Sequence, residues 1–100
     1  MDIRRITDQH KAVCRLVADK KVKNSLEVLN SMISVSGRGQ FRDEYENLAM
    51  TYRNILQYTI EGVKDPERDK IYNILLRSII NLADRVKQDI LSYYSGWYAY

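Results

Sequence analysis

Apolar side chains recur at three- and four-residue steps through the second half of this sequence, and that spacing constrains the fold more than any other feature. Between Phe41 and Val63, they fall in a stripe about 140° wide when plotted at ~100° per residue, as in an amphipathic helix. A strand would need alternating apolar and polar residues, which are absent here. The pattern predicts a helix over about residues 40–62. Asp43 and Glu46 form a capping-box pattern, but Phe41 is in phase and places the start just after Gly39.

A second long helix is predicted from Asp65-Pro66-Glu67, which supplies an N-cap acceptor, a proline at the first helical position and an acid in the first turn. Apolar residues then repeat at helical spacing from Ile71 to Tyr93, which predicts a helix over about residues 66–94. Its apolar arc covers more than half of the circumference. We therefore expect this helix to contact several neighbours and to lie at the centre of the fold.

The first 36 residues contain a hidden break. The apolar residues around Val13 and those around Leu29 lie on faces rotated by roughly 200° when drawn on one helix. Asn24 with Glu27 fits a capping box. These patterns predict two helices, over about residues 8–19 and 25–35, with Gly37 suited to the left-handed position that ends the second. One long helix that touches different neighbours at its two ends is the alternative.

Together these elements predict an all-α chain, either a four-helix bundle or two stacked antiparallel helical hairpins. The scarcity of helix breakers, four glycines and one proline, agrees with long helices. One hundred residues suit a single domain covering residues 1–100, which would be either self-contained or the N-terminal module of a longer chain. The single cysteine excludes an internal disulfide and fits a reducing compartment. With no signal peptide and no apolar run of about 18 residues, we expect a cytoplasmic protein without a membrane span.

Residues for catalysis or metal binding are sparse. His10 is the only histidine and lies four residues from Cys14, which is too few ligands for zinc. We expect a buried, inert Cys14 and an exposed His10 in the first turn of its helix. Neither phosphate-loop nor dinucleotide spacing is present. The sequence thus predicts a non-catalytic protein with no cofactor and no metal.

The last eight residues contain five aromatic side chains and no charge, an unusual composition for a chain end. These aromatic residues are Tyr93, Tyr94, Trp97, Tyr98 and Tyr100. They would fold back on the bundle, pack against a second copy or another protein as interface anchors, or begin the next helix of a longer chain after Ser95-Gly96. The leading expectation is a protein-interaction or scaffold module anchored by these residues.

Positive charge is concentrated near the N-terminus. Residues 1–23 hold seven basic and three acidic residues, a balance of +4, whereas the whole chain carries +3, so the remainder sums to −1. The basic residues are Arg4, Arg5, Lys11, Arg15, Lys20, Lys21 and Lys23. A solvated helix face is one explanation, and a nucleic-acid-binding domain that uses these residues is the alternative function.

The stretch Leu48-Ala49-Met50-Thr51-Tyr52 resembles the first helix of tetratricopeptide-like repeats. The diagnostic Trp-x2-Leu-Gly-x2-Tyr run and a 34-residue repeat are absent. The resemblance implies a helical scaffold that binds other proteins, and it assigns a role to no single residue.

Overall fold

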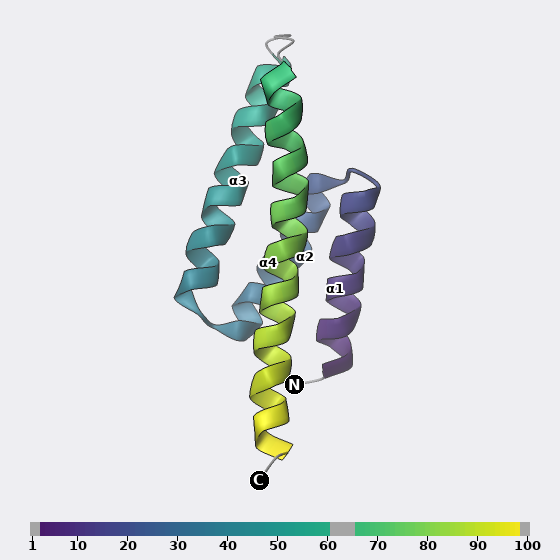
Figure 1. Cartoon of the computed structure of the whole chain (residues 1–100), viewed down its shortest axis with the longest axis vertical. Coiled ribbons are helices and arrows are strands. Elements are labelled where there is room, and N and C mark those ends of the chain that lie inside the picture. The colour runs from purple at the N-terminus through teal and green to yellow at the C-terminus, as the bar shows by residue number, and fades with distance from the viewer. Residues whose placement is uncertain (1–2, 61–65, 99–100) are drawn as a thin grey trace.

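The chain folds into four α-helices, as a computed structural model shows (Figure 1). The structure describes residues 3–60 and 66–98, and the side chains of residues 3–57 and 66–93. The helices are α1 (Ile3–Ala18), α2 (Val22–Ser36), α3 (Gly39–Ile60) and α4 (Pro66–Tyr98). The all-α fold class is therefore confirmed, although α1 begins five residues earlier than expected and α4 continues four residues further.

The helices alternate in direction, so that α1 pairs with α2 and α3 pairs with α4 as antiparallel hairpins (Figure 1). Helix α4 contacts the other three helices, as the width of its apolar arc predicted. Helices α1 and α3 lie on opposite flanks of α4, with α2 behind it (Figure 1). The two long helices extend well past the shorter hairpin, and the molecule measures 56 × 25 × 17 Å. The difference in hairpin length matters for the site described below.

The break in the first 36 residues is confirmed as a turn at residues 19–21. Lys20 adopts a positive φ of 61° there, a conformation that costs a non-glycine residue free energy. The expected Asn24 cap is wrong, because Lys21 is the N-cap residue and makes no side-chain cap hydrogen bond. The turn instead is held by backbone bonds, such as Lys21 N–H to the carbonyl oxygen of Leu16 at 2.8 Å.

The later helix ends follow local sequence signals more closely. Gly37 has φ 70° and its N–H donates to the carbonyl oxygen of Ile33, which is the predicted left-handed helix end. Helix α3 then begins at Gly39, so Asp43 lies inside the helix and is not its cap. Pro66 is the first residue of α4, with Glu67 and Asp69 in the first turn. The predicted cap residue Asp65 lies outside the described residues.

One continuous core joins the four helices. Among the residues whose side chains are described, sixteen buried apolar residues form this core. They include Ile6, Val13, Leu29, Met32, Ile33, Leu75, Ile79, Leu82, Ala83 and Val86, each at most 1% exposed. Ser25 is also fully buried, and its hydroxyl donates to the carbonyl oxygen of Val22 at 2.7 Å, which satisfies the polar group inside the core. No helix in the described part of the chain has an apolar stretch long enough to cross a membrane.

Candidate functional site

The upper turns of the long hairpin expose apolar side chains that the sequence placed in the core. Ile71 is 46% exposed and Leu56 is 42% exposed, although both are in phase with their helices' core stripes. The physical reason is the difference in length between the hairpins: α1 and α2 end below these turns, so no helix covers them (Figure 1). Ile74, outside the predicted stripe, is 57% exposed on the same helix.

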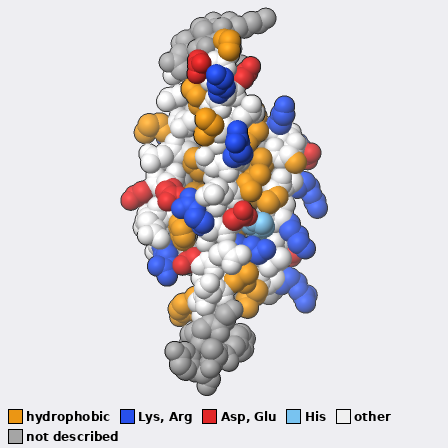
Figure 2. Space-filling model, in the orientation of Figure 1, with side chains coloured by type: hydrophobic (Ala, Val, Ile, Leu, Met, Phe, Trp, Pro, Cys, Tyr) orange, Lys and Arg blue, Asp and Glu red, His pale blue; other side chains and the backbone are white. Residues whose placement is uncertain are grey.

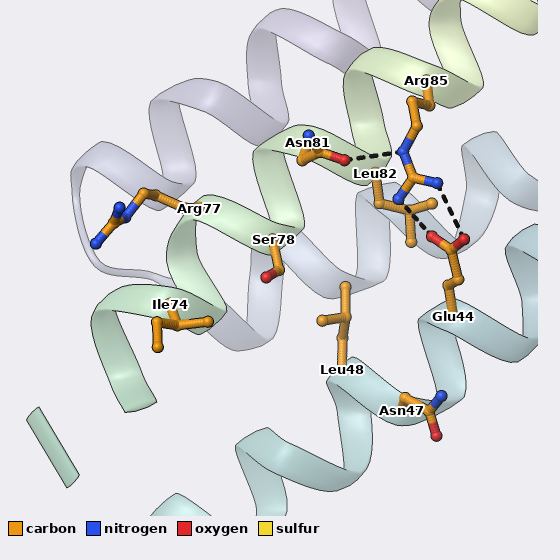
Figure 3. A pocket seen from close by; sticks show the side chains of 9 residues that line it. All are labelled: Glu44, Asn47, Leu48, Ile74, Arg77, Ser78, Asn81, Leu82 and Arg85. Carbon is orange, nitrogen blue, oxygen red and sulfur yellow. Dashed lines mark hydrogen bonds and ion pairs between the residues drawn. The ribbon is translucent and has the colours of Figure 1, made fainter. Parts of the chain in front are cut away.

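A groove of about 420 Å³ runs between α3 and α4 on this hairpin (Figure 3). Its apolar surface comes from Leu48 of α3 and from Ile74 and Leu82 of α4. Leu82 belongs to the core and is 1% exposed, Leu48 is half-buried, and Ile74 is mostly exposed. Apolar surface therefore passes from the core of the bundle to the open face of the hairpin, as in grooves that accept helices.

The charged side chains of the groove neutralise each other at one end, whereas the arginine at the other end has no ion pair within the described part of the chain. At one end both Arg85 amino groups donate to the Glu44 carboxylate, with 3.0 Å from Nη1 to Oε1, and Arg85 Nε donates to Asn81 Oδ1 at 2.8 Å. Arg77 points away from this pair (Figure 3) and has no ion pair with any described residue. The groove therefore presents one uncompensated positive charge beside its apolar surface.

The pair between Arg85 and Glu44 links α3 to α4 and makes stability depend on pH. The hydrogen bond from Arg85 lowers the pKa of Glu44 below its ordinary value of 4.5, and burial only partly opposes this. A carboxylate whose pKa is lowered by folding stabilises the protein above its unfolded pKa, and this contribution is lost as the pH falls. Because both side chains are more than 40% exposed, solvent screens the pair and its contribution is small.

We therefore expect Glu44→Gln to lower the free energy of unfolding by about 0.2–1 kcal/mol at pH 7, and this difference should shrink as the pH falls below 4.5. Urea denaturation of both proteins across that range measures it. Glu46→Gln, at an exposed position on the outer side of α3, should cause no such change. A difference in unfolding free energy that grows toward acid pH would contradict the lowered pKa of Glu44.

The three side chains of His10, Cys14 and Asp84 meet where α1 contacts α4. His10 Nε2 forms an ion pair with Asp84 Oδ1, and the same nitrogen lies 4.0 Å from Cys14 Sγ. The expectation of an exposed His10 in the first turn was wrong: α1 begins at Ile3, and the His10 side chain is only 16% exposed. Sequence reasoning missed the partner because Asp84 is 74 positions away.

This cluster lacks the arrangement of a cysteine nucleophile with its base. A catalytic histidine uses one ring nitrogen for the nucleophile and the other for the orienting carboxylate. Here Nε2 faces both groups. Cys14 is only half-buried, less than expected. Its partial burial, followed by the Asp84 carboxylate, raises the pKa of the thiol above 9.0, so the thiolate is scarce at neutral pH. Within the described residues, no group of three or more His, Cys, Asp or Glu side chains is arranged to hold a metal.

Cys14 should accordingly react slowly with iodoacetamide at pH 7.5, several-fold more slowly than the same residue in the urea-unfolded chain. Burial and the raised pKa both act in this direction. Mass spectrometry of timed samples measures the rate. A folded-state rate equal to or above the unfolded rate would show an activated thiol and contradict this interpretation.

The seven predicted anion-binding residues are all exposed, and the structure brings most of them to one flank. On α1, helical spacing places Arg4, Lys11 and Arg15 one after another on the same face, and all three are exposed. Figure 2 shows Lys and Arg side chains gathered along one edge of the molecule. Lys20, Lys21 and Lys23 continue from the turn into α2. Arg5 lies round the helix, near α2, where it and Arg4 line a second groove.

The predicted aromatic anchors lie near the end of the sequence, in and just after the last turns of α4. The backbone of α4 stays helical through Ser95 and Gly96 to Tyr98, because glycine weakens a helix but does not break it as proline does. It neither reverses toward the bundle nor turns at Ser95-Gly96, two of the arrangements expected for this segment. Tyr93 is 62% exposed. The side chains of Tyr94, Trp97 and Tyr98, and all of Tyr100, lie outside the described residues, so their role as anchors stays a prediction.

Comparison with models of protein families, with curated proteins and with solved structures gave no match. The resemblance of residues 48–52 to tetratricopeptide-like repeats is therefore not supported by any family model. What remains of that expectation is the architecture of antiparallel helical hairpins.

Proposed function

We propose that this protein is a non-catalytic helical interaction module, and that the groove between α3 and α4 binds an amphipathic helix of a protein partner. The observation that supports this most is the exposed apolar surface of the groove, where Ile74 is 57% exposed above the core residue Leu82. Exposed apolar surface beside a polar rim is typical of protein interaction sites.

Charge indicates the chemistry of the partner helix. Glu44 and Arg85 neutralise each other at one end of the groove, whereas Arg77 has no ion pair among the described residues. A partner helix with apolar side chains at helical spacing, and an acidic side chain opposite Arg77, complements both features. The exposed Tyr93 and the predicted anchors near the end of α4 would provide a second contact to the same or another protein.

A photo-reactive amino acid placed at position 74 tests the proposal in cells that make the protein. Position 50 is a matched control, because Met50 is 54% exposed but lies outside the groove. We expect a cross-link to one protein from position 74 and none from position 50. Mass spectrometry of the cross-linked peptide identifies the segment, which should be an acidic amphipathic helix.

Two results would contradict this assignment. Equal cross-linking from positions 74 and 50 would indicate that the groove is not a specific site. The chain has a mass of 11.8 kDa. A cross-linked species of twice that mass would identify a second copy of the chain, and not a different protein, as the occupant of the groove.

A further inference from the structure

The cations on the outer face of α1 form a straight ridge. From the geometry of an α-helix, Arg4 and Lys11 lie about 10 Å apart along the axis, Lys11 and Arg15 lie about 6 Å apart, and the three fall within roughly 40° of the circumference. All three are exposed. We call these residues, with Lys20, Lys21 and Lys23 of the following turn and first turn of α2, the basic ridge.

The cations of this ridge differ from most other cations of the molecule in their contacts with other side chains. Elsewhere, Arg38 donates to Asp89, Arg42 to Asn30 and Arg85 to Glu44, so these arginines hold helices together. By contrast, Lys11, Arg15, Lys20, Lys21 and Lys23 form no ion pair with any residue that the structure describes. Asp8 and Asp19 are the only acidic residues between positions 3 and 23, against seven basic ones. These five residues of the ridge thus carry positive charge that no ion pair with a described residue neutralises.

The surroundings of the ridge favour one kind of anionic partner. The apolar residues Ile6, Val13 and Val17 of α1 are at most 5% exposed, so α1 has no apolar face to insert into a membrane. For the same reason the ridge lacks the aromatic or apolar centre of a protein interface. Long, exposed cations in a line suit a partner with regularly repeating negative charge, which is the phosphate backbone of a nucleic acid.

We propose that the basic ridge of α1 binds the phosphate backbone of double-stranded nucleic acid without reading its sequence. The ridge lies on the flank of α4 opposite to α3 (Figure 1), so this surface is separate from the groove of the proposed function. Neither surface blocks the other, and one molecule can hold a nucleic acid and a protein partner together.

Fluorescence anisotropy of a labelled 24-base-pair DNA duplex of arbitrary sequence, titrated with the purified full chain, tests the proposal. Affinity should fall steeply between 50 and 300 mM salt, with a log–log slope of about −4 to −5 for four to six phosphate contacts. The double substitution Lys11→Gln/Arg15→Gln should weaken binding roughly tenfold or more at 100 mM salt and reduce the magnitude of the slope by about 2.

The control must remove the same charge from a different surface. Arg53→Gln/Lys70→Gln also removes two exposed cations, from α3 and α4, and should weaken binding less than about threefold because only the long-range field changes. Circular dichroism melting of both variants confirms that each is folded. Vesicles with 30% phosphatidylserine and polyglutamate serve as competing polyanions at equal charge concentration.

The proposal would be supported if the ridge substitutions weaken duplex binding, the salt slope has the expected value, and the duplex is preferred over both competitors. Equal losses from the two double variants would show a non-specific charge effect and overturn it. Tighter binding to vesicles or to polyglutamate would assign the ridge to a membrane or to an acidic protein, and absence of duplex binding at 50 mM salt would also refute the proposal.

Discussion

Replacing Phe41 by alanine should lower the free energy of unfolding by about 3–5 kcal/mol, as for other buried aromatic residues. Phe41 lies in the first turn of α3, is 5% exposed, and belongs to the core that joins the four helices. Helix α3 has few contacts besides those with α4 and with the end of α2, so the loss of this side chain removes much of what attaches its first turns. Domains of this size have about 5–15 kcal/mol of stability, and the substitution therefore removes a large share of it.

Urea denaturation followed by circular dichroism measures the Phe41→Ala effect. Phe41→Leu is the matched comparison, since it keeps most of the apolar volume and should cost less than half as much. A loss below about 1 kcal/mol for Phe41→Ala would contradict the burial of this residue and place it among surface positions.

Replacing Ile79 by alanine should cost about 2–5 kcal/mol, because the deleted atoms leave a cavity in a close-packed centre. Ile79 is completely buried on α4, which contacts all three other helices. The same substitution at Ile74, one and a half turns earlier on the same helix and 57% exposed, should cost less than about 1 kcal/mol. Thermal melting of the two variants compares them directly, with an expected difference of about 10–20 °C for a domain of this size. Equal melting temperatures would mean that the open face of α4 is covered.

Local signals in the sequence were enough to predict most of the fold. The rotation of the apolar face between Val13 and Leu29 predicted a break at about residues 20–24, and the turn lies at residues 19–21. Gly37 and Pro66 marked the end of α2 and the start of α4, because their backbone preferences act within one or two residues. The wide apolar arc of the last helix predicted its central position, because a helix that is apolar over more of its circumference packs against more neighbours.

Two kinds of feature could not be predicted from the sequence: how far one hairpin extends past the other, and which residues far apart in the sequence contact each other. Apolar phase identifies the side of a helix that faces the core, but not whether a neighbour reaches that level, so Leu56 and Ile71 were placed in the core and are in fact exposed. Contacts between distant positions, such as His10 with Asp84 and Glu44 with Arg85, likewise leave no local pattern in a single sequence. The only available signal for the groove was the apolar Ile74, which lies outside the core stripe of an otherwise periodic helix.

The affinity of the partner helix for two matched variants tests the proposed function most directly. A synthetic peptide would carry the sequence of the partner segment that cross-links to position 74. Calorimetry would measure its affinity for the native protein and for the variants Ile74→Glu and Met50→Glu. Both substitutions replace a side chain more than half exposed, but only Ile74 lines the groove. We expect Ile74→Glu to weaken binding at least roughly tenfold, through lost apolar contact and repulsion of an acidic partner, while Met50→Glu leaves it unchanged. Equal affinities of the two variants would contradict the assignment of the groove as the site where this protein binds its partner.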